Sequence, residues 1–395
     1  MRDFRSPAAG QTHRDFVDQG KWSIVSARRI RGQIAKIFFS LPKDSIVQPT
    51  QVISLATALP PHVIEQREAA AFAAEAFGSR YPDFERLSGV FMTSGIRRRH
   101  AVRPIEWYRE PLGWPERTEA FVSGAGDLFV AAAKRALEAA QLTAIEIDTI
   151  VTVSSTGVAT PSLEARVAMR MGFRPDVERV PVFGLGCAGG VSGLSIAARL
   201  ARSRPGSTVL LVVVETCTLS FRLDQLTKAN IVATALFGDG AAACVLRTAD
   251  AGLADVEMSA QHTWPDTLDI MGWSVDAEGL GVIFDRDIPP FAEANFGPAV
   301  EGMLGRSGLE LTDVERFVCH PGGAKVVTAL ERALSLQQGT LADERAVLAD
   351  CGNMSAPTVF FVLERAIRSG LPSRTLLTAM GPGFTASCAA LRTAA

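Results

Sequence analysis

The sequence predicts an α/β fold built from two similarly organised halves. Short, continuous apolar runs such as 147–155 and 207–215 are typical of strands buried on both faces of a sheet. Segments with helical periodicity lie between these runs, as expected of repeated strand–helix units. The alternation starts again after about residue 250. We therefore expect a duplicated α/β unit in which the carboxyl ends of the strands meet at the centre of the molecule.

The first half is expected to comprise residues 48–249. Its predicted strands are 51–60, 147–155, 179–184, 207–215 and 240–248. Its predicted helices are 61–79, 117–140, 161–172 and 187–203. No linker rich in Gly, Pro or Ser follows, so both halves are expected to form one compact body.

The second half is expected to comprise residues 250–395. Its predicted strands are 254–262, 280–285, a strand ending at 316–320, 374–380 and 385–393. Its predicted helices are 290–305, one that begins near 324, and 356–369. The order of strands and helices thus resembles that of the first half, which supports the duplication.

Residues 1–47 are unlike either half. After a polar start, the segment 22–43 is apolar with interleaved Arg and Lys. A helix lying on a membrane surface is one interpretation of this pattern. We favour the alternative, an N-terminal extension that is dispensable or packs on the body.

The composition is that of an ordinary globular protein. Of 395 residues, 47% are hydrophobic and 21% are charged, and no apolar run is long enough to span a membrane. The formal net charge of −2 argues against nucleic acid as a partner. Six cysteines follow no repeating framework, and no secretory signal opens the chain, so we expect free thiols and a cytoplasmic location.

One cysteine lies where a predicted strand turns into a predicted helix. In "PVFGLGCAGGVSGLSIAARL" (181–200), Gly184 and Gly186 permit a sharp turn into Cys187, and small residues after it leave room for an acyl chain. The N–H groups of a helix N-terminus lower the pKa of a thiol. We therefore expect a nucleophile for thioester chemistry. A tight structural junction is the alternative, and a dinucleotide-binding loop is disfavoured because no acidic ribose-binding residue follows on the next strand.

A base and a hydrogen-bond donor can be proposed for this nucleophile. His320 closes a buried strand in "FVCHPGG", at a carboxyl edge where α/β active sites collect. Asn353 lies in "DCGNMSAPT", and its uncharged amide can donate to a carbonyl oxygen without opposing an enolate. Cys319, His320 and Cys351 lack the spacing of a four-ligand zinc site, so no metal is expected.

Five motifs together resemble the type III polyketide synthases, the chalcone and stilbene synthase family with the thiolase fold. They occur in the family's order: "GLGCAGG", "ALFGDGAAA" (235–243), "CHPGG" (319–323), "CGNMSAPT" (351–358) and "MGPGFT" (380–385). The resemblance covers about residues 48–394. It implies a layered α-β-α-β-α body and an acyltransferase that condenses an acyl-CoA starter with malonyl-CoA. It further implies a homodimer with no cofactor besides the coenzyme A thioesters.

The resemblance also implies roles for individual residues. Cys187 matches the nucleophile that carries the acyl group, and His320 and Asn353 match the pair that promotes malonyl decarboxylation in the family. Phe237 matches the gatekeeper between substrate tunnel and cavity, and Phe284 the second gatekeeper. Further matches to substrate-binding positions are Ser155, Thr156, Thr160, Cys217, Ser220, Ser355, Gly381, Pro382 and Gly383.

Two features differ from plant chalcone synthases. Thr160 replaces a methionine that reaches across the dimer interface, and the C-terminal glycine motif has lost its first glycine.

Three consecutive cations, Arg97, Arg98 and Arg99, lie where the family has a basic segment near the coenzyme A tunnel. They are expected to contact phosphate, or alternatively to be solvated charges on a strand edge.

The starter unit is predicted from the small residues at 156, 160, 217 and 220, which leave space for a long chain. We favour a fatty acyl-CoA and an alkylresorcinol or alkylpyrone product, while aromatic starters and malonyl-only synthesis stay open. A ketoacyl-ACP synthase III or a head-to-head fatty acyl condensing enzyme is the nearest alternative. A cysteine hydrolase and a non-enzymatic thiolase-fold subunit are the others.

Overall fold

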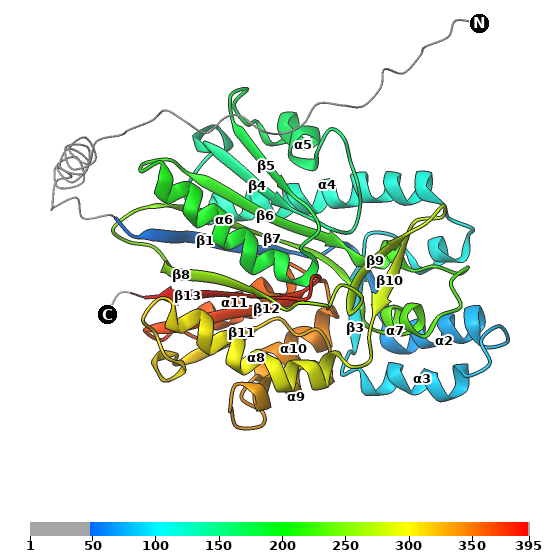
Figure 1. The fold of residues 1–395 in the computed structure, drawn as a ribbon. Coiled ribbons are helices and arrows are strands. Elements are labelled where there is room, and N and C mark those ends of the chain that lie inside the picture. Colours follow the sequence, from blue (N-terminus) through cyan, green and yellow to red (C-terminus); the bar gives the residue numbers. More distant parts are fainter. Residues whose placement is uncertain (1–47, 394–395) are drawn as a thin grey trace, which may run out of the picture. The chain divides into compact units, whose positions relative to one another are not determined.

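One nine-stranded sheet runs through the computed structural model, which describes residues 48–393 (Figure 1). The strand order is β11-β12-β13-β8-β1-β7-β6-β4-β5. Strands of the first half are β1 (Thr50–Ala58), β4 (Thr149–Val153), β5 (Glu178–Val182), β6 (Val209–Thr216) and β7 (Asp239–Thr248). Strands of the second half are β8 (Ala254–Thr263), β11 (Arg316–Cys319), β12 (Arg374–Gly381) and β13 (Thr385–Arg392). Every one of these strands coincides with a predicted one.

The two halves of the sheet join through a short antiparallel pairing of β1 with β8, Gln51 opposite Asp255 and Val52 opposite Ala254. In the first half, β4 pairs in parallel with β5 and β6, and β7 runs antiparallel to β6 and β1. In the second half, β11 and β12 are parallel. The carboxyl ends of β4, β5, β6 and β11 each lead directly into a segment that contributes to the site described below.

Helices form three layers around the two halves of the sheet (Figure 1). On the outer face of the first half, α4 (Trp114–Ala139) packs on β1, β6 and β7, and α5 (Leu163–Met171) packs on α4. Between the halves, α6 (Gly189–Ser203) and α11 (Thr358–Arg368) contact strands of both. On the outer face of the second half lie α8 (Ile288–Gly305) and α9 (Ala324–Ala333). The predicted α-β-α-β-α layering and thiolase-like fold are confirmed.

The central helix α6 comes unusually close to its neighbours. A Cβ at Gly190 would lie 2.3 Å from the carbonyl oxygen of Ala356, and one at Gly193 would lie 2.7 Å from a methyl group of Val153. Both distances are shorter than van der Waals contact, so these positions require glycine. The small residues therefore hold the helix that follows Cys187 tightly against the first half and against the segment before α11.

One predicted helix is wrong at its start. Residues 61–79 contain a short strand, β2 (His62–Glu65), before α2 (Gln66–Phe77) begins. The strand pairs with β3 (Arg98–Ala101), about 35 residues later, in a separate two-stranded sheet. This pairing is non-local, so no local pattern in 61–79 indicates it.

Several elements were not predicted from the sequence. They are α3 (Phe84–Thr93), α7 (Lys228–Leu236), α10 (Ala342–Cys351), β9 (Met271–Val275), which pairs with the predicted strand β10 (Leu280–Phe284), and the 3-10 helices η1 (Ile105–Arg109), η2 (Ala144–Glu146), η4 (Cys217–Ser220) and η5 (Leu311–Asp313). Many of them lie at the end of the molecule where the strands leave the sheet, and they form the walls of the site (Figure 1). The 3-10 helix η3 (Gly186–Ala188) takes up the start of the helix predicted at 187–203, and α6 follows it directly.

Within residues 48–393, no helix is both long and apolar enough to cross a membrane. The possible membrane-surface helix at 22–43 lies outside the described residues.

Candidate active site

Three residues from distant parts of the chain line one cavity of about 20 Å³. They are Cys187 in η3, just beyond β5, His320 directly after β11, and Asn353 after α10. All three side chains are buried. The sequence singled out these residues separately, and the fold brings them together.

The loop that presents Cys187 is shaped by two glycines and one serine. Gly184 and Gly186 have positive φ angles of 88° and 46°, which favour glycine. The hydroxyl group of Ser155 accepts hydrogen bonds from both of their N–H groups, each at 3.2 Å. A Cβ at Gly186 would lie 2.6 Å from the Pro382 ring. The C-terminal glycine motif therefore packs directly against the nucleophile loop.

Burial controls the charge state of the thiol and the imidazole. It raises the pKa of Cys187 to about 11, although a hydrogen bond from Ser355 opposes this shift. It lowers the pKa of His320 to about 4, and neither ring nitrogen has a hydrogen-bond partner among the described residues. The predicted lowering of the thiol pKa is thus reversed, because desolvation of a buried thiolate outweighs the effect of the helix N-terminus. Both shifts favour a neutral thiol and a neutral imidazole at rest.

Asn353 is held in one orientation by two hydrogen bonds. Its amide nitrogen donates to the carbonyl oxygen of Gly322 at 3.1 Å, and its amide oxygen accepts from the Ser355 N–H at 2.8 Å. A primary amide has two N–H donors. One N–H of Asn353 therefore remains for a ligand in the cavity that it shares with Cys187 and His320.

A second cavity of about 40 Å³ also reaches Cys187. Six of the residues predicted to bind substrate line this second cavity: Ser155, Cys217, Phe237, Phe284, Ser355 and Pro382. Trp273 from β9 is a further wall residue that sequence reasoning missed. Its indole N–H donates to the carbonyl oxygen of Ser155 at 2.8 Å, and its ring meets that of Phe237 edge-on at 6.3 Å. Only prediction of the β9–β10 hairpin could have placed it here.

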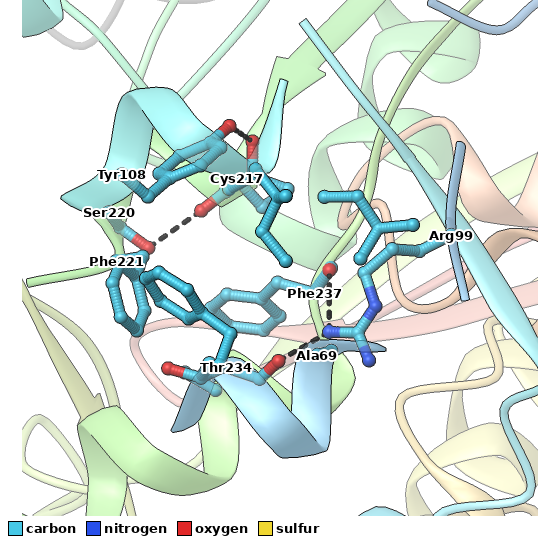
Figure 2. Close-up of a pocket in the computed structure, with 13 residues that line it drawn as sticks. Ala69, Arg99, Tyr108, Cys217, Ser220, Phe221, Thr234 and Phe237 are labelled. Carbon is cyan, nitrogen blue, oxygen red and sulfur yellow. Dashed lines mark hydrogen bonds between the residues drawn. The ribbon is translucent and has the colours of Figure 1, made fainter. Parts of the chain in front are cut away.

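Phe237 is also one of the residues that line a third cavity, of about 50 Å³ (Figure 2). Its walls are mainly apolar, with Cys217 and Phe237 common to this cavity and the second one. Ser220 lies here, and its hydroxyl donates to the carbonyl oxygen of Cys217 at 2.7 Å. Other lining residues are Ile64, Ala69, Phe72, Arg99, Ile105, Tyr108, Thr218, Phe221, Ala233 and Thr234. Phe237 therefore contributes to the walls of both the cavity at the thiol and this apolar cavity.

Four residues expected to contact substrate line none of these three cavities: Thr156, Thr160, Gly381 and Gly383. The Thr160 side chain is exposed. Thr156 is buried and donates to the carboxylate of Glu215 at 2.7 Å. Glu215 is fully buried, and burial raises its pKa to about 7, so nearby donors are needed to satisfy it. A carboxylate within the apolar run of β6 is a sequence signal that could have revealed this requirement.

The cations at the mouth of the site are not the ones that the sequence predicted. A cavity of about 670 Å³ opens beside α3, α7 and α9, and Phe284 lines both it and the two cavities at Cys187. Its cations are Arg86, Lys228, Arg286 and Lys325.

None of Arg97, Arg98 and Arg99 lines this mouth cavity. Arg97 and Arg98 are exposed and pair with Asp350, at 2.6 and 3.8 Å, so the alternative of solvated strand charges describes them. Arg99 is buried. Strand alternation turns it inward, which a sequence of three identical residues does not indicate.

Comparison with known proteins identifies the family. Profiles of the chalcone and stilbene synthases match residues 45–250 with the N-terminal domain and residues 255–394 with the C-terminal domain. The chain belongs to the chalcone and stilbene synthase family. It is accordingly a type III polyketide synthase and an acyltransferase.

Relatives and solved structures of this family match nearly the whole synthase body. A 1,3,6,8-tetrahydroxynaphthalene synthase of Streptomyces peucetius subsp. caesius is 40% identical over 351 residues, covering 87% of this chain and 93% of the relative. The alpha-pyrone synthesis polyketide synthase-like Pks18 of Mycobacterium tuberculosis is 31% identical, covering 84% and 88%. The crystal structure of the Streptomyces coelicolor tetrahydroxynaphthalene synthase superposes with a TM-score of 0.82 at 29% identity, covering 87% of this chain and all of that one.

Proposed function

We propose that this synthase loads an acyl-CoA starter on Cys187 and extends it with several malonyl-CoA units by decarboxylative Claisen condensation. The observation that carries the proposal is the shared cavity of Cys187, His320 and Asn353. There, both imidazole nitrogens and one amide N–H have no hydrogen-bond partner within residues 48–393. A thiol, a neutral base and two neutral donors are the groups that this chemistry requires. The coenzyme A thioesters supply the electrophile and the nucleophile, so we propose no further cofactor.

Acylation begins from the neutral pair. As the sulfur of Cys187 attacks the thioester carbonyl, the imidazole of His320 accepts the thiol proton, which avoids a free thiolate in a buried site. The imidazolium then returns the proton to the departing coenzyme A thiolate. The products are the Cys187 thioester and free coenzyme A.

Extension uses His320 and Asn353 as donors. The thioester oxygen of malonyl-CoA accepts hydrogen bonds from the imidazole and from the free amide N–H. When carbon dioxide leaves, the electron pair of the broken bond forms an enolate whose oxygen these donors stabilise. The enolate carbon attacks the acyl carbonyl on Cys187, and the bond to the sulfur breaks. The lengthened chain is then held on coenzyme A, and the departing Cys187 thiolate takes a proton from water to regenerate the thiol.

We propose a fatty acyl starter and an alkylresorcinol or alkylpyrone product. The third, apolar cavity, which Phe237 helps to line, supports this assignment, because each methylene buried there contributes about 0.8 kcal/mol. Its resting volume of about 50 Å³ holds only a few methylenes, so a long chain requires the Phe237 ring to turn. The tetrahydroxynaphthalene synthase relatives favour a second candidate product, tetrahydroxynaphthalene.

The mouth cavity is proposed to receive coenzyme A. Arg86, Lys228, Arg286 and Lys325 come from four different elements or loops and supply positive charge at its rim. Phosphate groups favour such sites. Phe284, which lines this cavity and both inner cavities, is proposed as the gate through which the pantetheine arm passes.

A homodimer is proposed to form at β5. This strand ends the sheet, and its unpaired edge can template pairing with a second copy. Apolar side chains are exposed beside it, Phe183 directly after β5 and Val158 after the neighbouring β4. Thr160 is exposed in the same β4–α5 loop, where the family's cross-dimer residue is expected. Sedimentation of the protein and of a Phe183→Glu variant tests the interface.

A mass-spectrometric product screen tests the function. The protein is incubated with malonyl-CoA alone and with acyl-CoA starters of graded length, beside a Cys187→Ala control. Alkylresorcinols or alkylpyrones from long starters support the proposal, and tetrahydroxynaphthalene from malonyl-CoA alone supports the second candidate. Product from the control, or activity only with acyl carrier protein thioesters, would contradict it.

A further inference from the structure

Arg99 is a buried cation that pairs with no carboxylate in the part of the chain that the structure describes. Its side chain is 3% exposed, and none of the ion pairs within residues 48–393 includes it. Burial lowers its pKa to about 10, which reflects the cost of holding an uncompensated charge there. The neighbours Arg97 and Arg98 are exposed and carry no such cost. A buried guanidinium group without an ion pair must be stabilised by hydrogen bonds to neutral acceptors.

The acceptors of Arg99 are neutral oxygens at the end of α7 (Figure 2). The guanidinium group donates to the carbonyl oxygens of Thr234, of Ala235 at 3.0 Å and of Phe237 at 3.3 Å. The side-chain oxygen of Gln66 is a fourth acceptor. The last carbonyls of a helix have no partner within the helix and carry partial negative charge. Arg99 satisfies these groups where α7 ends.

The end of α7 also holds two residues of the proposed active site. Phe237 follows the helix directly, and its backbone forms a parallel bridge with Asn353. The Asn353 N–H donates to the carbonyl oxygen of Leu236 at 2.8 Å, and the Gly238 N–H donates to that of Asn353 at 3.0 Å. Any shift of this helix end therefore moves both the Phe237 ring and the Asn353 amide.

The stem of Arg99 packs against both chains of this bridge. A Cβ at Gly238 would lie 3.3 Å from the Cβ of Arg99, and one at Gly352 would lie 3.4 Å from it. The arginine thus contacts the backbone on both sides of the Phe237–Asn353 pairing. Its guanidinium group holds the end of α7 through the hydrogen bonds to the carbonyls of Thr234, Ala235 and Phe237.

We propose that Arg99 is a positioning residue that aligns Asn353 for decarboxylation and Phe237 for starter selection by capping α7. The role rests on the proposed function of these two residues. The planar guanidinium fork suits it, because donors point in several fixed directions and can reach four oxygens at once. The Ala235 carbonyl also accepts from the Gln66 side-chain amide, at 3.1 Å. A lysine ammonium keeps the charge but has three donors on one atom, so it cannot reproduce the fixed, divergent directions of the guanidinium donors.

The test compares Arg99→Lys and Arg99→Met with Arg98→Lys, a control at the adjacent exposed position. Acyl loading of Cys187 is followed by intact-protein mass spectrometry, and decarboxylation by release of acetyl-CoA from malonyl-CoA. Product profiles with short and long starters report on Phe237. Thermal melting reports on folding, and Arg99→Lys keeps the test informative if Arg99→Met does not fold.

We expect Arg99→Lys to load acyl groups within about twofold of the wild type and to decarboxylate about 10- to 100-fold more slowly, since displacement of about 1 Å can cost 100-fold. Its starter-length profile should broaden, while Arg98→Lys should match the wild type. Equal losses of loading and decarboxylation, or no change in either, would overturn the proposal. A wild type that loads but does not decarboxylate would instead refute the proposed function.

Discussion

Alkylation of Cys187 by iodoacetamide should accelerate about tenfold for each pH unit between pH 7 and pH 10. Only the thiolate reacts, and burial raises the pKa of this thiol to about 11. About one molecule in 10⁴ therefore carries the thiolate at pH 7, and about one in 10² at pH 9. The alkylation rate should rise about 100-fold over these two units.

His320 should not change this slope, because burial holds its pKa at about 4 and the imidazole stays neutral above pH 5. Moving a proton from a thiol of pKa about 11 to an imidazole of pKa about 4 costs about 10 kcal/mol. Two unit charges about 4 Å apart regain only about 4 kcal/mol at an effective dielectric constant of 20. The neutral pair is therefore the resting state.

Peptide mass spectrometry can follow the alkylation of each cysteine between pH 6 and pH 10 in the wild type and in His320→Ala. Cys187→Ala provides the background from the other thiols. Those thiols are buried as well, and burial raises the pKa of Cys351 to about 12 and the pKa of the remaining four well above the ordinary value of a thiol. They should therefore react more slowly. A wild-type rate that is flat from pH 6 to pH 9, with a steep rate in His320→Ala, would refute the reasoning and establish a resting thiolate–imidazolium pair.

Three further substitutions test the proposed roles. Asn353→Ala should spare acyl loading and slow malonyl-CoA decarboxylation at least tenfold, because its free N–H serves only the enolate; equal loss of both steps would contradict this. Cys217→Trp should fill the space beside Phe237 and lower turnover of long starters selectively, by about 0.8 kcal/mol for each excluded methylene, whereas Thr160→Trp, at an exposed position, should leave the starter profile unchanged. Lys325→Glu should raise the KM for acyl-CoA several-fold at low salt, and Arg97→Glu should not. A larger KM increase in Arg97→Glu than in Lys325→Glu would instead place the coenzyme A site at Arg97–Arg99.

Much of the fold could be predicted from the sequence because its signals are local. The buried strands β4, β6 and β7 are continuous apolar runs, and the ends of helices and strands carry glycines or prolines in sequence. Cys187 and His320 stand at such ends, where α/β sites form, so their chemistry could be inferred before their proximity was known. The small β2–β3 sheet could not be predicted, because its two strands lie about 35 residues apart in the sequence.

The tertiary structure decided what the environment of each side chain is. Burial reverses the expected shift of the Cys187 pKa, because desolvation depends on all the elements that close around the thiol. The fold also buries Arg99 while its two identical neighbours are exposed, since only the third side chain points to the end of α7. The same tertiary contacts bring Trp273 to the thiol cavity and assemble the mouth cations from segments more than 200 residues apart. The sequence by itself determined which groups could do the chemistry, through local patterns of strand, turn and helix. Only the fold decided their charge and their neighbours, because both depend on contacts between residues far apart in the chain.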